Sequence, residues 1–150
     1  QVISDVAVST PQGGTVKVTV LTKYGLPSAI LQEKIRQYIS GEKRRPLCDT
    51  VIVAVPERKS YRVVANLDLL ATYAENEVKA RAETALRTYL SSRTQKLGLD
   101  IVPLDIQAVL KVEGVYDVHL TSPALTELTQ EQWAECEDIT ININAERKDG

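Results

Sequence analysis

The spacing of apolar residues along this chain changes from every second residue to every third or fourth residue, and back again. A period of two is typical of a strand with one buried face, and a period near 3.6 indicates a helix with one buried stripe. Because the two patterns alternate, the chain must build sheets against which its helices pack. This single feature limits the fold to layers of helices and strands.

In the first third of the chain, residues 16–20 alternate valine with polar residues and predict a half-buried strand. A helix is predicted after Pro27, because proline presets the backbone of a first turn and Ser28 can cap it. We expect Gly41 to end this helix. The helix has one apolar stripe, at Leu31, Ile35, Tyr38 and Ile39. Residues 51–55 are apolar throughout, which predicts a strand that is central or covered on both faces.

The rest of the chain repeats the same alternation of elements. The predicted order is a strand over 61–69, a long helix over 75–96, a short helix that Pro103 opens and Gly114 closes, a strand over 116–120, a loop over 122–137 and a last strand over 139–143. Most of these strands have one polar face, so helices should cover only one side of each sheet. The order β-α-β followed by β-α-α-β-β therefore predicts an α+β fold with mostly antiparallel or mixed sheets.

Pro11, Gly13 and Gly14 make residues 1–14 resemble a lead-in or linker. We expect two small α/β subdomains after it, at 15–59 and 60–150. The chain has no methionine and begins with Gln1, so we interpret it as a fragment of a longer protein.

Composition excludes several classes of function. The net charge is −2, so the sequence has no basic stripe for nucleic acid, and Lys43–Arg45 is interpreted as a solvated turn. No apolar run approaches the roughly 20 residues of a membrane-spanning helix. Cys48 and Cys136 lie far apart in a chain with a single histidine, which argues against a zinc site. We expect both cysteines to be buried thiols and not a disulfide.

The sequence contains no recognisable catalytic or cofactor motif: no nucleophile elbow, zinc-protease motif, phosphate loop or dinucleotide fingerprint. His119 is the one candidate imidazole base, and Asp117 shares its strand face. Because no nucleophile can be tied to them by spacing, we interpret them as a solvated pair. We therefore predict no catalytic residue, no cofactor, no metal ligand and no enzymatic activity.

Several short motifs occur along the chain in the same order as in one protein family, which the chain resembles. They are VTVL at 18–21, GLPS at 25–28, RPLCDTV at 45–51, YRVVA at 61–65, LGLDI at 97–101, GVYDV at 114–118, SP at 122–123 and CEDI at 136–139. In this combination, over about residues 15–145, the chain is similar to the C-terminal half of the baseplate assembly protein J family of contractile-tailed phages. Cys48 stands where that family typically carries threonine, and Leu104 where a serine often caps the short helix.

The resemblance implies a structural protein of the baseplate wedge, in a phage or a phage-like contractile tail, that contacts other wedge proteins and neighbouring copies of itself. It implies a location in the virion tail baseplate, reached from the bacterial host cytoplasm during assembly, and no nucleic-acid, membrane or small-molecule partner. Trp133 and the last strand are the predicted interface, with the residues Trp133, Ile141, Asn142, Ile143 and Asn144. A lid over the end of the sheet is the alternative for Trp133. A small ligand-binding or regulatory α+β module is the alternative for the whole chain.

Overall fold

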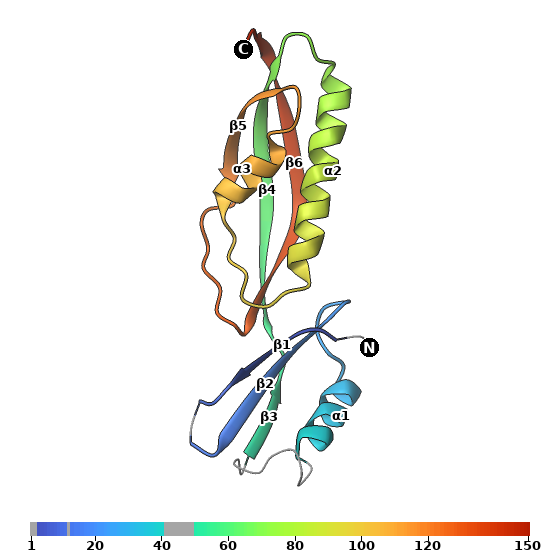
Figure 1. The fold of residues 1–150 in the computed structure, drawn as a ribbon, viewed down its shortest axis with the longest axis vertical. Helices are drawn as coiled ribbons and strands as arrows, with labels where there is room; N and C mark the ends of the chain where they lie inside the picture. Colours follow the sequence, from blue (N-terminus) through green and yellow to red (C-terminus); the bar gives the residue numbers. More distant parts are fainter. Residues whose placement is uncertain (1–2, 12, 41–49) are drawn as a thin grey trace. The chain divides into compact units, whose positions relative to one another are not determined.

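The computed structural model describes residues 3–11, 13–40 and 50–150. The chain folds into two compact units. The first contains the described residues of 1–58 together with two later segments, 95–99 and 129–133, that the sequence assigns to the second subdomain. The second contains residues 59–94, 100–128 and 134–150. The predicted α+β class is confirmed, and each unit has a three-stranded sheet with helices (Figure 1).

In the first unit, β1 (Ile3–Ser9) and β2 (Thr15–Thr22) form an antiparallel hairpin. Helix α1 (Ala29–Ser40) then connects β2 to β3 (Thr50–Ala54), which pairs with β2 in parallel. The sheet order is β1-β2-β3. The Ser28 hydroxyl accepts a hydrogen bond from the Leu31 backbone N–H at 3.1 Å, so Ser28 caps α1 as the sequence indicated.

The prediction of a linker over residues 1–14 is wrong, because β1 lies within this segment. Val6 and Val8 supply apolar residues at alternate positions and pair with Val20 and Val18 of β2. The Pro-Gly cluster was the misleading signal, because its residues form the turn of the hairpin, where Gly14 has a φ of 77°.

The expected place of the strand over 51–55 is also wrong. β3 lies at the edge of its sheet, and Ile52 and Val55 are 43% and 44% exposed. The central strand is β2, in which residues 18–22 are all buried. Its alternation of valine and threonine suggested one wet face, but a threonine can be buried where neighbouring segments cover it.

Two late segments complete this first unit. The Lys17 ammonium lies 3.0 Å from a carboxylate oxygen of Glu131, and the Ser9 hydroxyl donates to the other oxygen at 3.3 Å. The Leu97 backbone N–H donates to the Asp5 carboxylate at 2.7 Å. Residues 95–99 and 129–133 thus bind side chains of β1 and β2, and the Trp133 ring lies against Gly25, just beyond β2.

The second unit begins on β4 (Glu57–Leu70) and continues through α2 (Glu75–Thr94) and α3 (Pro103–Leu110) to β5 (Val115–Ser122) and β6 (Gln132–Lys148). The sheet order is β5-β4-β6, with β5 antiparallel to β4. Glu57 N–H donates to Glu131 O and Ala71 N–H to Lys148 O, so β6 runs parallel to β4. Figure 1 shows the long helix α2 running lengthwise along this sheet.

The main core fills the space between this sheet and its helices. Four alternate residues of β4 and four residues of α2 at every fourth position are buried, because these spacings place them on one face of each element. The buried set is Val63, Ala65, Leu67, Leu69, Val78, Ala82, Leu86, Leu90, Ile106, Leu110, Val115 and Ile141.

Gly114 does not close α3 as predicted, because the helix already ends at Leu110; it lies instead just before β5, with a φ of 97°. Its carbonyl accepts a hydrogen bond from the Leu70 N–H at 2.9 Å. The N-terminal cap residue of α3 is Val102, and no side chain caps the helix by a hydrogen bond. Leu104, which stands where the family often has a serine, does not cap it.

The predicted loop over 122–137 is partly wrong, because β6 already begins at Gln132. Glu135 and Glu137 made this stretch look like a loop. A strand at the edge of a sheet tolerates such charges, because one side of it faces solvent.

Candidate functional site

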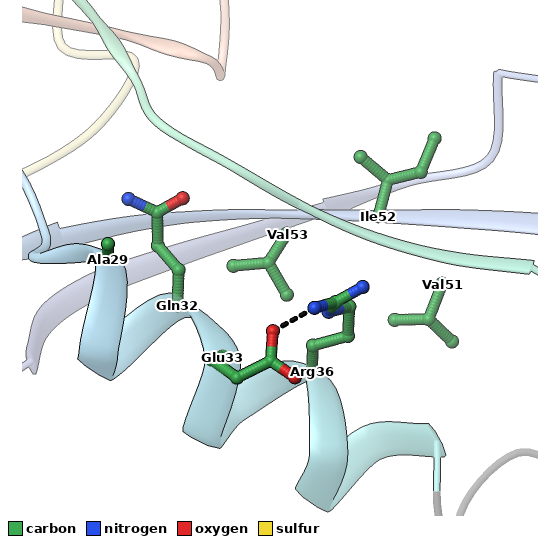
Figure 2. Close-up of a pocket in the computed structure, with 7 residues that line it drawn as sticks. All are labelled: Ala29, Gln32, Glu33, Arg36, Val51, Ile52 and Val53. Carbon is green, nitrogen blue, oxygen red and sulfur yellow. Dashed lines mark hydrogen bonds and ion pairs between the residues drawn. The ribbon is translucent and has the colours of Figure 1, made fainter.

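A cleft of about 350 Å³ lies between α1 and β3 in the first unit (Figure 2). Its polar groups are already engaged, since the Arg36 guanidinium pairs with Glu33 one turn earlier on the helix and Gln32 donates to the Pro27 carbonyl at 3.1 Å. The wall formed by β3 is apolar and consists of Val51, Ile52 and Val53. Among the described residues that line it, the cleft therefore presents no free charged group for a substrate.

A second hollow of about 350 Å³ lies between α1 and the β1–β2 hairpin, and it is almost entirely apolar. Of the described residues that line it, Lys34 is the charged one. The other lining residues are Ile3, Val6, Val18, Val20, Ile35, Tyr38 and Ile39. Tyr38 was predicted to lie on the buried stripe of α1 but is 64% exposed, so α1 covers this hairpin only partly.

Polar side chains gather on the open face of the second sheet, where β5 and β6 flank the central strand β4. His119 Nε2 lies 2.8 Å from Asp68 Oδ2 and 3.5 Å from Asp117 Oδ2. Asn144 of β6 donates to Asp68 Oδ1 at 2.6 Å. Both oxygens of the Asp68 carboxylate therefore have a hydrogen-bond partner, although the residue is only 9% exposed.

The electrostatics of this cluster follow from those contacts. Hydrogen bonds from Asn144 and then His119 lower the pKa of Asp68 below its ordinary value. The hydrogen bond to Asp68, helped by the charge of Asp117, raises the pKa of His119. Asp68 and Asp117 face each other directly across β4 and β5, where two like charges repel, so a protonated His119 relieves that repulsion.

Three of these groups could in principle converge on a metal ion, because one ligand atom each from Asp68, Asp117 and His119 lie within 4.8 Å of one another. The arrangement does not resemble a catalytic triad. In the described part of the chain, the His119 ring forms its hydrogen bond with Asp68, a carboxylate and not a nucleophilic hydroxyl or thiol. Charge pairing between strands is the chemistry that this geometry supports.

The predicted interface residues have different surroundings. Trp133 is 3% exposed and covers Gly25, where a methyl group would lie 3.9 Å from its ring, so its position agrees with the alternative of a lid. Ile141 is 4% exposed in the core, and Ile143 packs against that core. Asn144 is bound to Asp68, and only Asn142 has an exposed side chain. The strand itself does lie at a sheet edge, as the sequence suggested.

Cys136 is a free, half-buried thiol whose Sγ lies 3.2 Å from the Asp138 carbonyl oxygen, and burial raises its pKa. Cys48 and Lys43–Arg45 lie outside the described residues. Sequence reasoning missed Asp68 as the partner of His119, and Asn144 as the second partner of Asp68. The polar face of each strand was visible in the sequence, but the register that brings these faces together was not.

No helix in the described part of the chain combines the length and apolar character needed to cross a bilayer. Residues 1–55 match the family model of the baseplate J-like central domain, and residues 61–142 match that of the baseplate J-like protein C-terminal domain. The central-domain match includes the segment that we had expected to be a linker.

The chain is also 32% identical over 123 residues to baseplate protein J of Escherichia phage P2. That similarity covers 81% of this chain but 40% of the phage protein, so the chain spans well under half the length of this relative. The two consecutive domain matches show that the chain belongs to the baseplate J-like protein family.

Proposed function

We propose that this chain is a structural part of a phage tail baseplate and acts by binding other baseplate proteins. The observation that carries the proposal is the pair of family matches, central domain followed by C-terminal domain, which together span most of the chain. The similarity to a protein named baseplate protein J supports the same role. As finer points of the proposal, the protein occupies the baseplate wedge in several copies, assembles in the host cytoplasm and has no catalytic activity.

The surface supports binding to proteins more than chemistry on a substrate. The polar groups at the α1–β3 cleft and around Asp68 are paired with one another. Large apolar side chains, by contrast, remain exposed on the first unit, including Val8 at 60% and Tyr38 at 64%. Several of these side chains line one apolar hollow between α1 and the hairpin, and contiguous apolar surface marks sites of protein contact.

For the interface we propose the backbone edge of β6 around Ile141–Asn144. Because Ile141 and Ile143 pack in or against the core, they would hold the strand in place while its free edge meets a partner. Trp133 is not part of the proposed contact surface, because its ring is buried. We propose that it stabilises the first unit instead.

Co-expression with the other baseplate proteins of the same tail tests the proposed function. We expect at least one of them to co-purify with the chain through gel filtration, and a double variant carrying a lysine at Thr140 and at Asn142 to reduce that binding. Recovery of the chain alone from every pairwise co-expression would contradict the proposal.

The small ligand-binding module remains the second candidate, because the apolar hollow beside Tyr38 is large enough for a small molecule. This reading predicts a chain that stays monomeric with every baseplate protein and melts at a higher temperature with an apolar ligand. Thermal melts with and without such ligands separate the two functions.

A further inference from the structure

Three side chains that can bind a metal ion meet on the open face of the second sheet, one from β4 and two from β5. His119 Nε2 lies 2.8 Å from Asp68 Oδ2 and 3.5 Å from Asp117 Oδ2, and one ligand atom of each residue lies within 4.8 Å of the other two. In a tetrahedral Zn²⁺ site with bonds of about 2.0–2.2 Å, neighbouring ligand atoms are about 3.4 Å apart. The two distances from His119 lie on either side of that value, so small side-chain rotations bring all three ligands around one ion.

We propose that Asp68, Asp117 and His119 bind a divalent transition-metal ion of the Zn²⁺ type, with water in the remaining position. The cysteine and histidine content of the chain had argued against a zinc site, but an open site needs only three protein ligands and accepts carboxylates. The inference goes beyond the proposed function and does not depend on it.

The hydrogen bonds around the two carboxylates orient them for this role. Asp68 Oδ1 accepts a hydrogen bond from the Asn144 amide at 2.6 Å, and Asp117 Oδ1 accepts one from the Val118 backbone N–H at 2.8 Å. The other oxygen of each carboxylate faces His119 Nε2. Outer hydrogen bonds of this kind fix the ligands of metal sites in a productive orientation.

The charge balance of the cluster suits a dication. Asp68 and Asp117 lie directly opposite each other on neighbouring strands and together carry two negative charges. The charge of Lys148 acts on Asp68 and His119, but its ammonium also lies 3.5 Å from the Glu146 carboxylate, which offsets it. A protonated His119 supplies one positive charge, whereas an ion bound to the neutral ring supplies two, and any proton held on Nε2 leaves to solvent.

The exposure of the three side chains gives an ion a rigid anchor and a route of entry. The side chain of Asp68 is 13% exposed and hydrogen-bonded at both oxygens, so its position is fixed. Those of Asp117 and His119 are 54% and 53% exposed, which leaves them free to adjust and leaves room for water. An imidazole ligand favours Zn²⁺ over Mg²⁺, because Mg²⁺ prefers oxygen ligands throughout.

Calorimetric titration of the full 150-residue chain with ZnCl₂ tests the proposal. Cys48→Ser and Cys136→Ser are introduced into every protein tested, because thiols also bind Zn²⁺. We expect saturable one-to-one binding, and a dissociation constant at least about tenfold higher after His119→Gln. His119 is the single histidine of the sequence, so no other imidazole can take its place. Circular dichroism checks that each variant is folded.

Two matched pairs of variants separate ligation from a general effect of charge or structure. Asp117→Asn and Asp138→Asn each remove one negative charge from an exposed strand position, and only the first should weaken Zn²⁺ binding by about tenfold or more. Because Asn144 positions Asp68, Asn144→Ala should weaken binding by about tenfold, whereas Asn142→Ala should not change it.

Absence of saturable Zn²⁺ binding up to about 1 mM overturns the proposal, and so does an unchanged dissociation constant after His119→Gln. Equal effects of Asp117→Asn and Asp138→Asn, or Mg²⁺ binding as tight as Zn²⁺ binding, would show attraction to acidic charge in general and would also overturn it. Equal dissociation constants for the two asparagine variants would refute the positioning role of Asn144.

Discussion

Replacing Gly114 with alanine should destabilise the second unit strongly. At its φ of 97°, a residue with a Cβ is strained by about 1–2 kcal/mol. The new methyl group would also lie 2.7 Å from Cγ2 of Val78 and 3.0 Å from the Tyr73 ring. Val78 is fully buried in the core, so it cannot move aside freely, and such overpacking costs about 1–3 kcal/mol. We therefore expect Gly114→Ala to lower the free energy of unfolding by about 2–5 kcal/mol.

Urea unfolding followed by far-ultraviolet circular dichroism measures this loss. Gly13→Ala is the matched control, because a methyl group at Gly13 would meet nothing within 4 Å and its φ is not in the left-handed region. The control should change stability by less than about 1 kcal/mol in either direction. If Gly114→Ala behaves like Gly13→Ala, the close packing of Val78 and Tyr73 around this turn is not real.

Three further outcomes are expected. Because the pKa of His119 is raised above its ordinary 6.5 by Asp68, its contribution to stability is present below the unfolded pKa and is lost as the pH rises through the folded value. Urea unfolding between about pH 5.5 and 8.5 should show this decline, and His119→Gln should remove it; an unchanged slope would contradict the assignment. Asn144→Ala leaves Asp68 Oδ1 without its donor and should lower stability more than Asn142→Ala, and equal thermal melting temperatures for these two variants would argue against the Asp68 contact. Trp133→Ala should cost the first unit about 3–5 kcal/mol in a denaturant titration, and a loss below about 1 kcal/mol would show that the ring is not buried.

The sequence predicted the helices and the order of elements from Thr15 onward better than it predicted the sheets. The stripe of Val78, Ala82, Leu86 and Leu90 repeats over the whole of α2, so local spacing alone identifies the helix and its buried face. Strand neighbours depend on residues far apart in the chain. The same apolar run that suggested a central strand therefore turned out to be the edge strand β3, and β1 was hidden by the glycines of its own turn.

The candidate site was predictable only in part. The pair of Asp117 and His119 follows from the period of one strand, but its third member Asp68 lies 51 positions from His119 along the chain, on the neighbouring strand. The enrichment of tryptophan at protein interfaces likewise singled out Trp133, without revealing whether its ring faces solvent or the fold. Its burial depends on the return of residues 129–133 to the first unit, which no local pattern encodes.

That return limits how the protein can be dissected. A polypeptide excised at the end of the central-domain match, near residue 55, would carry β1, β2, α1 and β3 but not the Glu131 carboxylate that pairs with Lys17 or the indole that shields Gly25. The Asp5 carboxylate would lose the Leu97 N–H as well. A domain boundary taken from the family match therefore divides one structural unit. A protein designed to contain only the N-terminal sheet would also need residues 95–99 and 129–133.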